Sequence, residues 1–196
     1  MTDKGTIGVY DDMADDYARR FSGWEVNPRL AAFIAALPKG GAVLDLGCGP
    51  GAASAAMAQA GLKVTALDAS RQMARIAKET HGIDVVVAGF DWVTGEAEYD
   101  GVWASFSLLH APREEMAGHL ARLHKALKPG GRLMLGLKRG TGAARDSIGR
   151  LYTYYEVEEV DALLRTAGFT PFDTEFGEDV GLDGTTAPWL ITHARA

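Results

Sequence analysis

The chain has 196 residues, of which 47% are hydrophobic and 23% are charged, and its formal net charge is −6. This length and composition predict one globular domain with its own core and exclude a disordered chain. The acidic balance disfavours binding to nucleic-acid phosphates or to an anionic membrane surface. A single cysteine excludes an internal disulfide and a zinc site built from several thiolates. We expect a protein of a reducing, cytoplasmic compartment, with no apolar leader and no membrane span.

The N-terminal part of the chain has a helical pattern. Apolar residues recur from Tyr10 to Phe21 at helical spacing, with acidic and basic residues between them. A second apolar stretch, residues 30–37, ends at a turn over residues 38–41. The pattern predicts two helices ahead of the first strand.

From residue 42 onwards, strand and helix patterns alternate, which predicts an α/β fold with a mostly parallel sheet. The predicted strands are residues 42–46, 63–67, 83–87, 99–104, 132–137, 169–176 and 188–194. The predicted helices are residues 52–60, 70–80, 113–127 and 157–164. Residues 138–150 are predicted to be a loop. The connection between the last two strands is too short for a crossover helix, so these strands are predicted to be antiparallel.

A glycine-rich turn, residues 47–51 with the sequence Gly-Cys-Gly-Pro-Gly, follows the first strand directly. Glycines let a ligand approach the backbone closely, because no Cβ stands in the way. The turn lies at the carboxyl end of a strand, where open α/β sheets bind ligands, and it leads into a helix N-terminus. The sequence therefore predicts a ligand-binding turn, with a purely structural strand-to-helix turn as the alternative.

Two aspartates near this turn indicate the kind of ligand. Asp68 ends the second strand, about twenty residues past the turn, where dinucleotide folds place an acid on the ribose hydroxyls. Asp45 lies within the first strand, where a buried carboxylate favours a cationic ligand and opposes a pyrophosphate. S-adenosylmethionine carries a sulfonium and an amino group but no phosphate. Asp45 therefore favours this cofactor over NAD, and the glycine spacing also departs from G-x-G-x-x-G.

Residues 43–51 resemble the first motif of the class I S-adenosylmethionine-dependent methyltransferases. Residues 68–73, 99–105 and 127–133 are similar to the second motif, the fourth-strand motif and the turn into the fifth strand of that family. The resemblance implies a Rossmann-like three-layer sandwich with a seven-stranded, mostly parallel sheet of order 3-2-1-4-5-7-6, whose last strand is antiparallel. It also implies a single domain over residues 1–196, with an N-terminal helical lid (1–38) and a Rossmann-like core (39–196).

The resemblance further implies where the cofactor, S-adenosyl-L-methionine, is bound. The turn backbone lies along the methionine part, Asp68 holds the ribose, and Asp91 accepts from the adenine amino group. The predicted cofactor-binding residues are Tyr17, Asp45, Gly47, Cys48, Gly49, Asp68, Ala69, Met73, Phe90, Asp91, Trp92 and Ser105. For Tyr17, Phe90 and Trp92 the alternative is an aromatic side chain that packs in the core.

His110 follows the fourth strand and is the candidate general base, because the ordinary histidine pKa of about 6.5 suits proton removal near neutral pH. The alternative is that no base is used, since holding the reacting groups in line supplies much of the acceleration. Cys48 lacks the preceding proline of cytosine C5-methylating enzymes, so it is not predicted to be a nucleophile. The other histidines have no ligand spacing, and no metal site is predicted.

The acceptor is predicted to be a small molecule. Residues 104–107 lack the Pro-Pro motif of enzymes that methylate DNA amino groups or protein glutamine. The basic and aromatic residues that follow the fifth strand are candidates to receive an anionic or aromatic acceptor, or else form a solvated loop. These residues are Lys138, Arg139, Arg145, Arg150, Tyr152, Tyr154 and Tyr155. The acceptor atom (O, N, S, C or a metalloid) stays open.

The predicted function is therefore methyl transfer from S-adenosylmethionine to a small-molecule acceptor, by a monomer or homodimer without nucleic-acid or membrane partners. A small NAD(P)-binding oxidoreductase is one alternative, which Asp45 and the glycine spacing disfavour. A non-catalytic cofactor-binding module is the other.

Overall fold

The computed structural model describes residues 3–20 and 27–196. The helices are α1 (Lys4–Asp12), α2 (Ala14–Arg20), α3 (Pro28–Ala35), α4 (Ala52–Gln59), α5 (Arg71–His81), α6 (Met116–Ala126) and α7 (Val157–Thr166). The strands are β1 (Ala42–Leu46), β2 (Lys63–Asp68), β3 (Val85–Val87), β4 (Tyr99–Ser105), β5 (Leu127–Lys138), β6 (Ala143–Arg145), β7 (Leu151–Thr153), β8 (Thr170–Val180) and β9 (Thr186–Arg195). Short 3-10 helices lie at η2 (Phe90–Trp92), η3 (Leu108–His110) and η4 (Arg113–Glu115).

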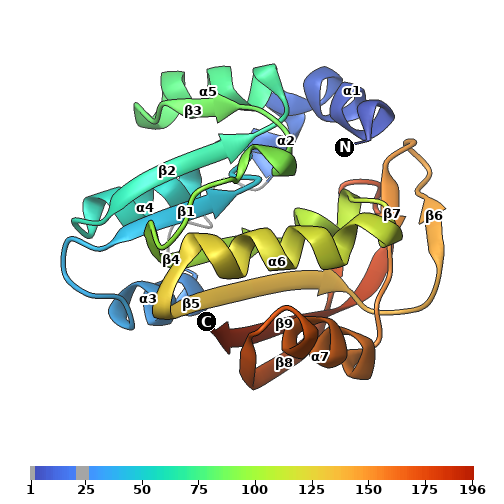
Figure 1. Ribbon diagram of the computed structural model, residues 1–196. Coiled ribbons are helices and arrows are strands. Elements are labelled where there is room, and N and C mark those ends of the chain that lie inside the picture. Colours follow the sequence, from blue (N-terminus) through green and yellow to red (C-terminus); the bar gives the residue numbers. More distant parts are fainter. Residues whose placement is uncertain (1–2, 21–26) are drawn as a thin grey trace.

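The main sheet has seven strands in the order β3-β2-β1-β4-β5-β9-β8 (Figure 1). Strands β1 to β5 pair in parallel, and β9 runs antiparallel to both β5 and β8. Because β6 and β7 pair with each other outside this sheet, β8 and β9 are its sixth and seventh strands. The predicted order 3-2-1-4-5-7-6 is therefore confirmed, and so is the antiparallel last strand.

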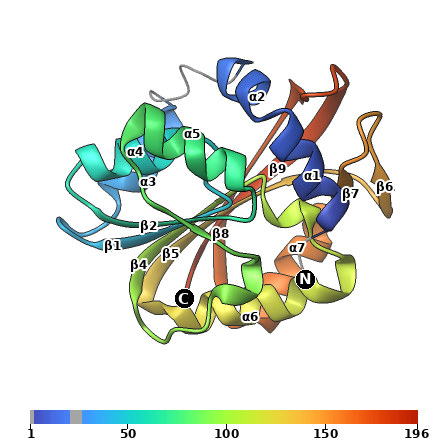
Figure 2. The same cartoon turned by 90° about the horizontal axis from the view of Figure 1, so that it is seen from above.

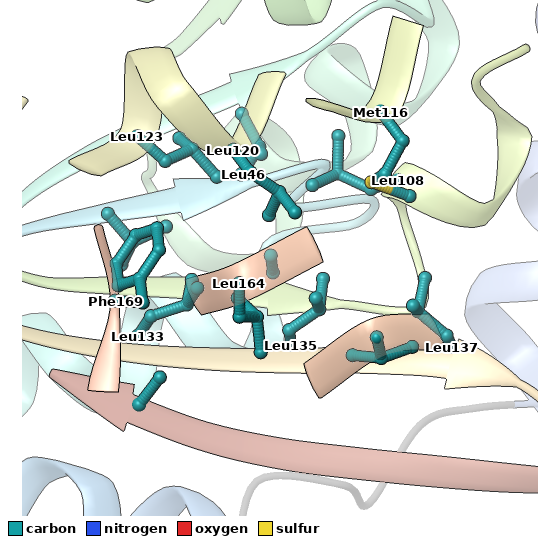
Figure 3. Close-up of a cluster of buried hydrophobic side chains, with 14 of the residues drawn as sticks. Leu46, Leu108, Met116, Leu120, Leu123, Leu133, Leu135, Leu137, Leu164 and Phe169 are labelled. Atoms are coloured by element: carbon teal, nitrogen blue, oxygen red, sulfur yellow. The ribbon is translucent and has the colours of Figure 1, made fainter. Parts of the chain in front are cut away.

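Helices cover both faces of the sheet, which gives the predicted three-layer sandwich. Figure 2 shows α3, α4 and α5 on one face and α6 and α7 on the other. In Figure 3, Leu120 and Leu123 of α6 and Leu164 of α7 pack toward Leu133 and Leu135 of β5. Each of these side chains is at most 2% exposed, and burial of such a side chain contributes roughly 1.5–3 kcal/mol. This core makes the sheet a rigid platform for the turns at its edge.

The N-terminal segment forms two helices, α1 and α2, where the pattern from Tyr10 to Phe21 predicted one. α1 ends at Asp12, and Met13 leaves helical geometry with φ −107° and ψ 13° before α2 begins. The break lets α2 pack its buried Ala14 against Met73 and Ile76 of α5. Phe21, the last residue of the predicted pattern, lies outside the described residues.

The segment 138–150, which was predicted to be a loop, contains β6. This strand pairs antiparallel with β7, and the pair forms a hairpin beside the main sheet (Figure 1). Each strand has three residues, which is too short for a hydrophobic pattern to reveal it. The predicted helix over 113–127 also differs, because residues 113–115 form a 3-10 turn and Leu127 already belongs to β5.

Across residues 3–20 and 27–196, no helix combines the length and apolar character that crossing a membrane requires.

Candidate functional site

The glycine turn is fixed by contacts that exclude larger side chains. The backbone N–H groups of Gly47 and Cys48 both donate to Leu67 O of β2, at 2.7 and 2.9 Å. Gly47 has φ +75°, and a Cβ added there would lie 2.3 Å from the Cβ of Ser107. These contacts hold the turn between the ends of β1, β2 and β4, so its conformation depends on glycine at this position.

Gly49 is different, because its surroundings are open. Its φ is +53°, and the nearest atom to an added Cβ is Cε1 of Tyr17, at 4.0 Å. Its N–H donates to Oδ2 of Asp68 at 2.8 Å, while Oδ1 of Asp68 accepts from the N–H of Ser70 at the same distance. Burial raises the pKa of Asp68, and each of its oxygens keeps a second lone pair for a ligand. The turn thus presents backbone and a carboxylate to the same open space.

Two cavities adjoin this turn. The larger encloses about 210 Å³ and the smaller about 80 Å³. The residues that line both are Tyr10, Tyr17, Gly47, Gly49, Ser105 and Phe106. The smaller cavity extends over Asp68, Ala69, Met73 and Phe90. The larger cavity extends in the other direction, past Asp45 and Cys48 towards the aromatic and basic residues at the ends of β5, β7 and β9.

Phe106 stands at the junction of the two cavities with a strained backbone. Its φ is +54°, a left-handed conformation that a bulky residue rarely adopts. The strain is held by a hydrogen bond from its N–H to Gly136 O at 3.1 Å. A Cβ on Gly136 would lie 3.2 Å from the Phe106 nitrogen, so the two backbones approach closely. Strain of this kind persists where the surrounding structure enforces it, and it is common at ligand sites.

Asp45 is a buried carboxylate at the wall of the larger cavity. It is 2% exposed, and its Oδ2 accepts from the Ser54 hydroxyl at 2.6 Å. Burial raises its pKa to about 7. Within residues 3–20 and 27–196, no lysine, arginine or histidine forms an ion pair with it. A cationic ligand group in the cavity would compensate this charge, as expected from the sequence.

His110 is engaged on both sides of its ring. Its Nδ1–H donates to Leu151 O at 2.6 Å, so its Nε2 is the acceptor for the Tyr10 hydroxyl at 2.8 Å. The same hydroxyl accepts from Arg150 at 3.0 Å. Burial lowers the pKa of His110 to about 4, so the ring is neutral near pH 7. The structure therefore places the candidate general base beside the smaller cavity, with its basic nitrogen already occupied.

The N-terminal helices lie over both cavities. Tyr17 of α2 lines them and packs edge-on against Tyr10 of α1, with 5.7 Å between ring centroids. Asp11 accepts from the Ser70 hydroxyl at 2.6 Å, which ties α1 to the N-terminus of α5. Figure 2 shows α1 and α2 bridging from α5 to the β6–β7 hairpin. That residues 1–38 act as a lid stays a prediction.

The structure brings eleven of the thirteen predicted site residues to the cavities and leaves out two. Asp91 and Trp92 lie on η2 with exposed side chains, and neither lines either of these two cavities. Trp92 is 42% exposed, so it is not the core aromatic considered as its alternative either. Phe90, on the same 3-10 turn, points to the smaller cavity and contacts His119 edge-on. A three-residue turn presents its side chains in different directions, which the sequence does not resolve.

Sequence reasoning missed Trp103 and Trp189, which line the larger cavity. The strand pattern marks both as apolar, but it does not show which tryptophan reaches the edge of the sheet. It also missed a cluster on β8 and β9, where ligand atoms of Asp173, Glu175 and His193 lie within 4.8 Å of one another. Arg29 pairs with Glu175 at 2.6 Å, which compensates that carboxylate, and we assign the cluster no metal role.

Comparison with known proteins agrees with this geometry. Residues 43–131 match a family model described as a methyltransferase domain. The mitochondrial ubiquinone biosynthesis O-methyltransferase of Schizosaccharomyces pombe is 32% identical over 124 residues, which are 60% of this chain and 43% of that protein. The chain spans about half the length of the curated relatives it matches.

A solved relative has both ligands in place. The 1,6-didemethyltoxoflavin-N1-methyltransferase of Burkholderia thailandensis, with bound 1,6-didemethyltoxoflavin and S-adenosylhomocysteine, is 27% identical, with a TM-score of 0.71 over 96% of this chain and 87% of that one. The [4+2]-cyclase SpnF shares the fold at 21% identity and a TM-score of 0.64, covering 85% of this chain and 79% of that one. Fold alone therefore does not define the reaction.

The glycine turn, the sheet order and the matched domain together indicate the class. Residues 43–131 match a methyltransferase domain, and in fold and sequence the chain is similar to the class I S-adenosylmethionine-dependent methyltransferases. The cofactor indicated is S-adenosylmethionine, and the site fits it. The open space at Gly49 lets a ligand contact the backbone, and Asp68 faces the same space. The buried Asp45, which has no ion-pair partner among the described residues, suits a ligand that carries a positive charge and no phosphate.

Proposed function

We propose that this protein transfers a methyl group from S-adenosylmethionine to a small-molecule acceptor bound in the larger cavity. The observation that carries the proposal is the continuity of the two cavities at the Gly47–Gly49 turn. A ligand on the turn is thereby in contact with a second space of about 210 Å³, which suits a small organic molecule rather than a folded macromolecule.

Different residues of the chain bind different parts of the cofactor. Asp68 accepts from the ribose hydroxyls, and Ala69, Met73 and Phe90 flank the base. The methionine end is held by the residues Tyr17, Gly47, Cys48, Gly49 and Ser105. When bound, S-adenosylmethionine supplies a sulfonium methyl group that a nucleophile displaces in line.

Asp45 supplies a charge at the methionine end. Burial holds its pKa at about 7, and a nearby ligand ammonium favours its ionised form. Asp91 and Trp92 are left out of the proposed site, because their side chains reach neither cavity. His110 acts as a positioning residue, because its hydrogen bonds join Tyr10 of α1 to the backbone of β7.

The acceptor side supports a planar ring. Trp103, Phe106, Tyr152 and Trp189 all line the larger cavity, and Phe106 and Trp189 meet edge-on at 6.4 Å. The relatives are named for ubiquinone biosynthesis and for 1,6-didemethyltoxoflavin, which is consistent with a ring acceptor. Since His110 holds no free basic nitrogen, we expect catalysis by positioning and an acceptor whose nucleophile ionises readily.

The proposal is tested by incubating the protein with methyl-labelled S-adenosylmethionine and a panel of phenols, catechols and nitrogen heteroaromatics. Transfer RNA and an unstructured peptide serve as macromolecular acceptors. Label in at least one small molecule is expected, with kcat/KM reduced at least about tenfold in Asp68→Asn. Label only in RNA or peptide overturns the small-molecule acceptor. Cofactor binding without any transfer supports a non-catalytic module.

A further inference from the structure

The larger cavity has a wall that is rich in hydrogen-bond donors, formed where β5, β7 and β9 end. Lys138 is the last residue of β5, and it is the register partner of Trp189 in β9. Its Nζ lies 4.1 Å from the centroid of the Tyr152 ring in β7. All three side chains line the larger cavity. We call Lys138, Tyr152 and Trp189 the donor wall.

The ammonium group of the donor wall has no ion-pair partner among residues 3–20 and 27–196, whereas the neighbouring Arg150 does. Arg150 pairs with Asp146 at 2.7 Å and donates to the Tyr10 hydroxyl. Asp183 attracts the Lys138 charge from a distance, and burial lowers the pKa of Lys138. The cation is therefore partly desolvated without a counter-charge in contact, which is unfavourable until a ligand supplies one.

The other two members of the donor wall are also unsatisfied. Tyr152 is 4% exposed, and its hydroxyl makes no hydrogen bond within the described ranges. Trp189 is 7% exposed, and its indole N–H is buried without a partner. Buried donors are normally paired, because an unmade bond costs about 1–3 kcal/mol. Of the three donors, the Trp189 N–H is such a buried group without a partner, whereas the Lys138 ammonium and the Tyr152 hydroxyl have no partner among the described residues but are not fully buried. All three side chains line one cavity.

The ring and the acidic group of a ligand would meet different parts of this cavity. The tryptophan and phenylalanine side chains offer flat apolar surface, while the donor wall offers a charge and N–H and O–H groups. Asp179 lines the cavity too, from the exposed end of β8, and Asp45 lies by the glycine turn. An anionic group is therefore favoured at the donor wall and disfavoured at both carboxylates.

We propose that Lys138, Tyr152 and Trp189 bind the carboxylate of a planar aromatic acceptor and so select aromatic acids over neutral rings of the same shape. This inference rests on the proposed function, because it assigns the larger cavity to the acceptor. The carboxylate accepts from the Lys138 ammonium and from the two neutral donors. Charge-assisted bonds of this kind are stronger than those between neutral groups.

The test is calorimetric titration with 3,4-dihydroxybenzoate and with its neutral amide, 3,4-dihydroxybenzamide, in the presence of saturating S-adenosylhomocysteine. The wild-type protein is expected to bind the acid at least about tenfold more tightly than the amide. Lys138→Met is expected to bring the ratio close to one. Tyr152→Phe and Trp189→Phe keep the rings and are expected to reduce the ratio by a smaller factor.

Lys63→Met is the matched control. Lys63 is exposed at the start of β2, at the opposite edge of the sheet, so this variant has the same net charge as Lys138→Met. It is expected to keep the wild-type ratio. Equal binding of acid and amide overturns the inference, as does a ratio that survives Lys138→Met or a failure of both probes to bind when S-adenosylhomocysteine binds. Failure of S-adenosylhomocysteine itself to bind contradicts the proposed function instead.

Discussion

The smaller and the larger cavity meet at the glycine turn but are walled by different kinds of structure. The smaller is walled in part by the turns at the ends of β1 and β2, within residues 47–49 and 68–73, and otherwise by α1, α2 and the segments that follow β3 and β4. The larger is walled by side chains from segments far apart in the chain, such as Trp103, Lys138 and Trp189. A ligand in the smaller cavity therefore depends more on the backbone conformation of these turns, and one in the larger cavity depends more on side-chain chemistry. Substitutions in the turns of the smaller cavity should therefore change the backbone conformation, and substitutions in the larger cavity should change which ligands bind.

The largest loss of stability is expected where a substitution forces the backbone of the glycine turn to change. Gly47→Ala places a methyl group 2.3 Å from the Ser107 Cβ and requires alanine at φ +75°. Strain and overpacking together should lower the free energy of unfolding by about 2–5 kcal/mol, as measured by urea denaturation. S-adenosylhomocysteine binding should be lost as well.

Gly82→Ala is the matched control for this prediction. Gly82 has φ +71°, but no atom lies within 4 Å of an added Cβ. This variant should therefore show only the conformational cost, about 1–2 kcal/mol, and should bind S-adenosylhomocysteine normally. Equal losses in the two variants would show that contact with Ser107 does not hold the turn.

A pH series sharpens the comparison at Asp45, on the wall of the larger cavity. Burial raises its pKa from 3.8 to about 7, so in this window the folded protein keeps a proton that the unfolded chain has lost. The free energy of unfolding contributed by this group therefore falls as pH rises from about 4 to 7, by up to roughly 4 kcal/mol. Asp45→Asn should remove that fall, so the stability difference between variant and wild type should grow with pH. A difference independent of pH would contradict the buried, unpaired carboxylate.

Asp68→Asn tests the carboxylate that the smaller cavity presents to its ligand. The amide replaces one acceptor oxygen with a donor, which opposes the N–H of Gly49 or of Ser70. S-adenosylhomocysteine affinity should fall about tenfold to a hundredfold in calorimetry. Asp100→Asn is the control. Asp100 also accepts a hydrogen bond from a backbone N–H, that of Ala42, but it lies at the amino end of β4, away from the glycine turn. Equal weakening in both variants would mean that Asp68 acts only through stability.

The smallest effect is expected at the hydrogen bonds that join α1 to Arg150 and His110. Tyr10→Phe removes the hydroxyl that joins Arg150 to His110 and leaves the His110 Nε2 without its donor. The free energy of unfolding should fall by about 1–2 kcal/mol in urea denaturation. Tyr154→Phe, whose hydroxyl has no hydrogen bond among the described residues, should change it by less than about 0.5 kcal/mol. The prediction fails if the two variants are equally stable.

Features that depend on a short stretch of sequence could be predicted, and features that depend on contacts between distant segments could not. The glycine turn and Asp68 are local signals at strand ends, and they contribute to the family resemblance that implied the sheet order and most of the residues of the smaller cavity. The break at Met13 and the β6–β7 hairpin depend on tertiary contacts and are too short for periodicity to reveal. His110 looked like a free base because its partners, Tyr10 and Leu151, are distant in sequence and meet only in the fold.

The most direct test of the account is calorimetric titration of the wild-type protein with S-adenosylhomocysteine and, separately, with NADH. Asp45 and the glycine turn predict micromolar binding of S-adenosylhomocysteine and no heat from NADH. Binding of NADH without binding of S-adenosylhomocysteine would contradict the cofactor, and with it the role assigned to both cavities.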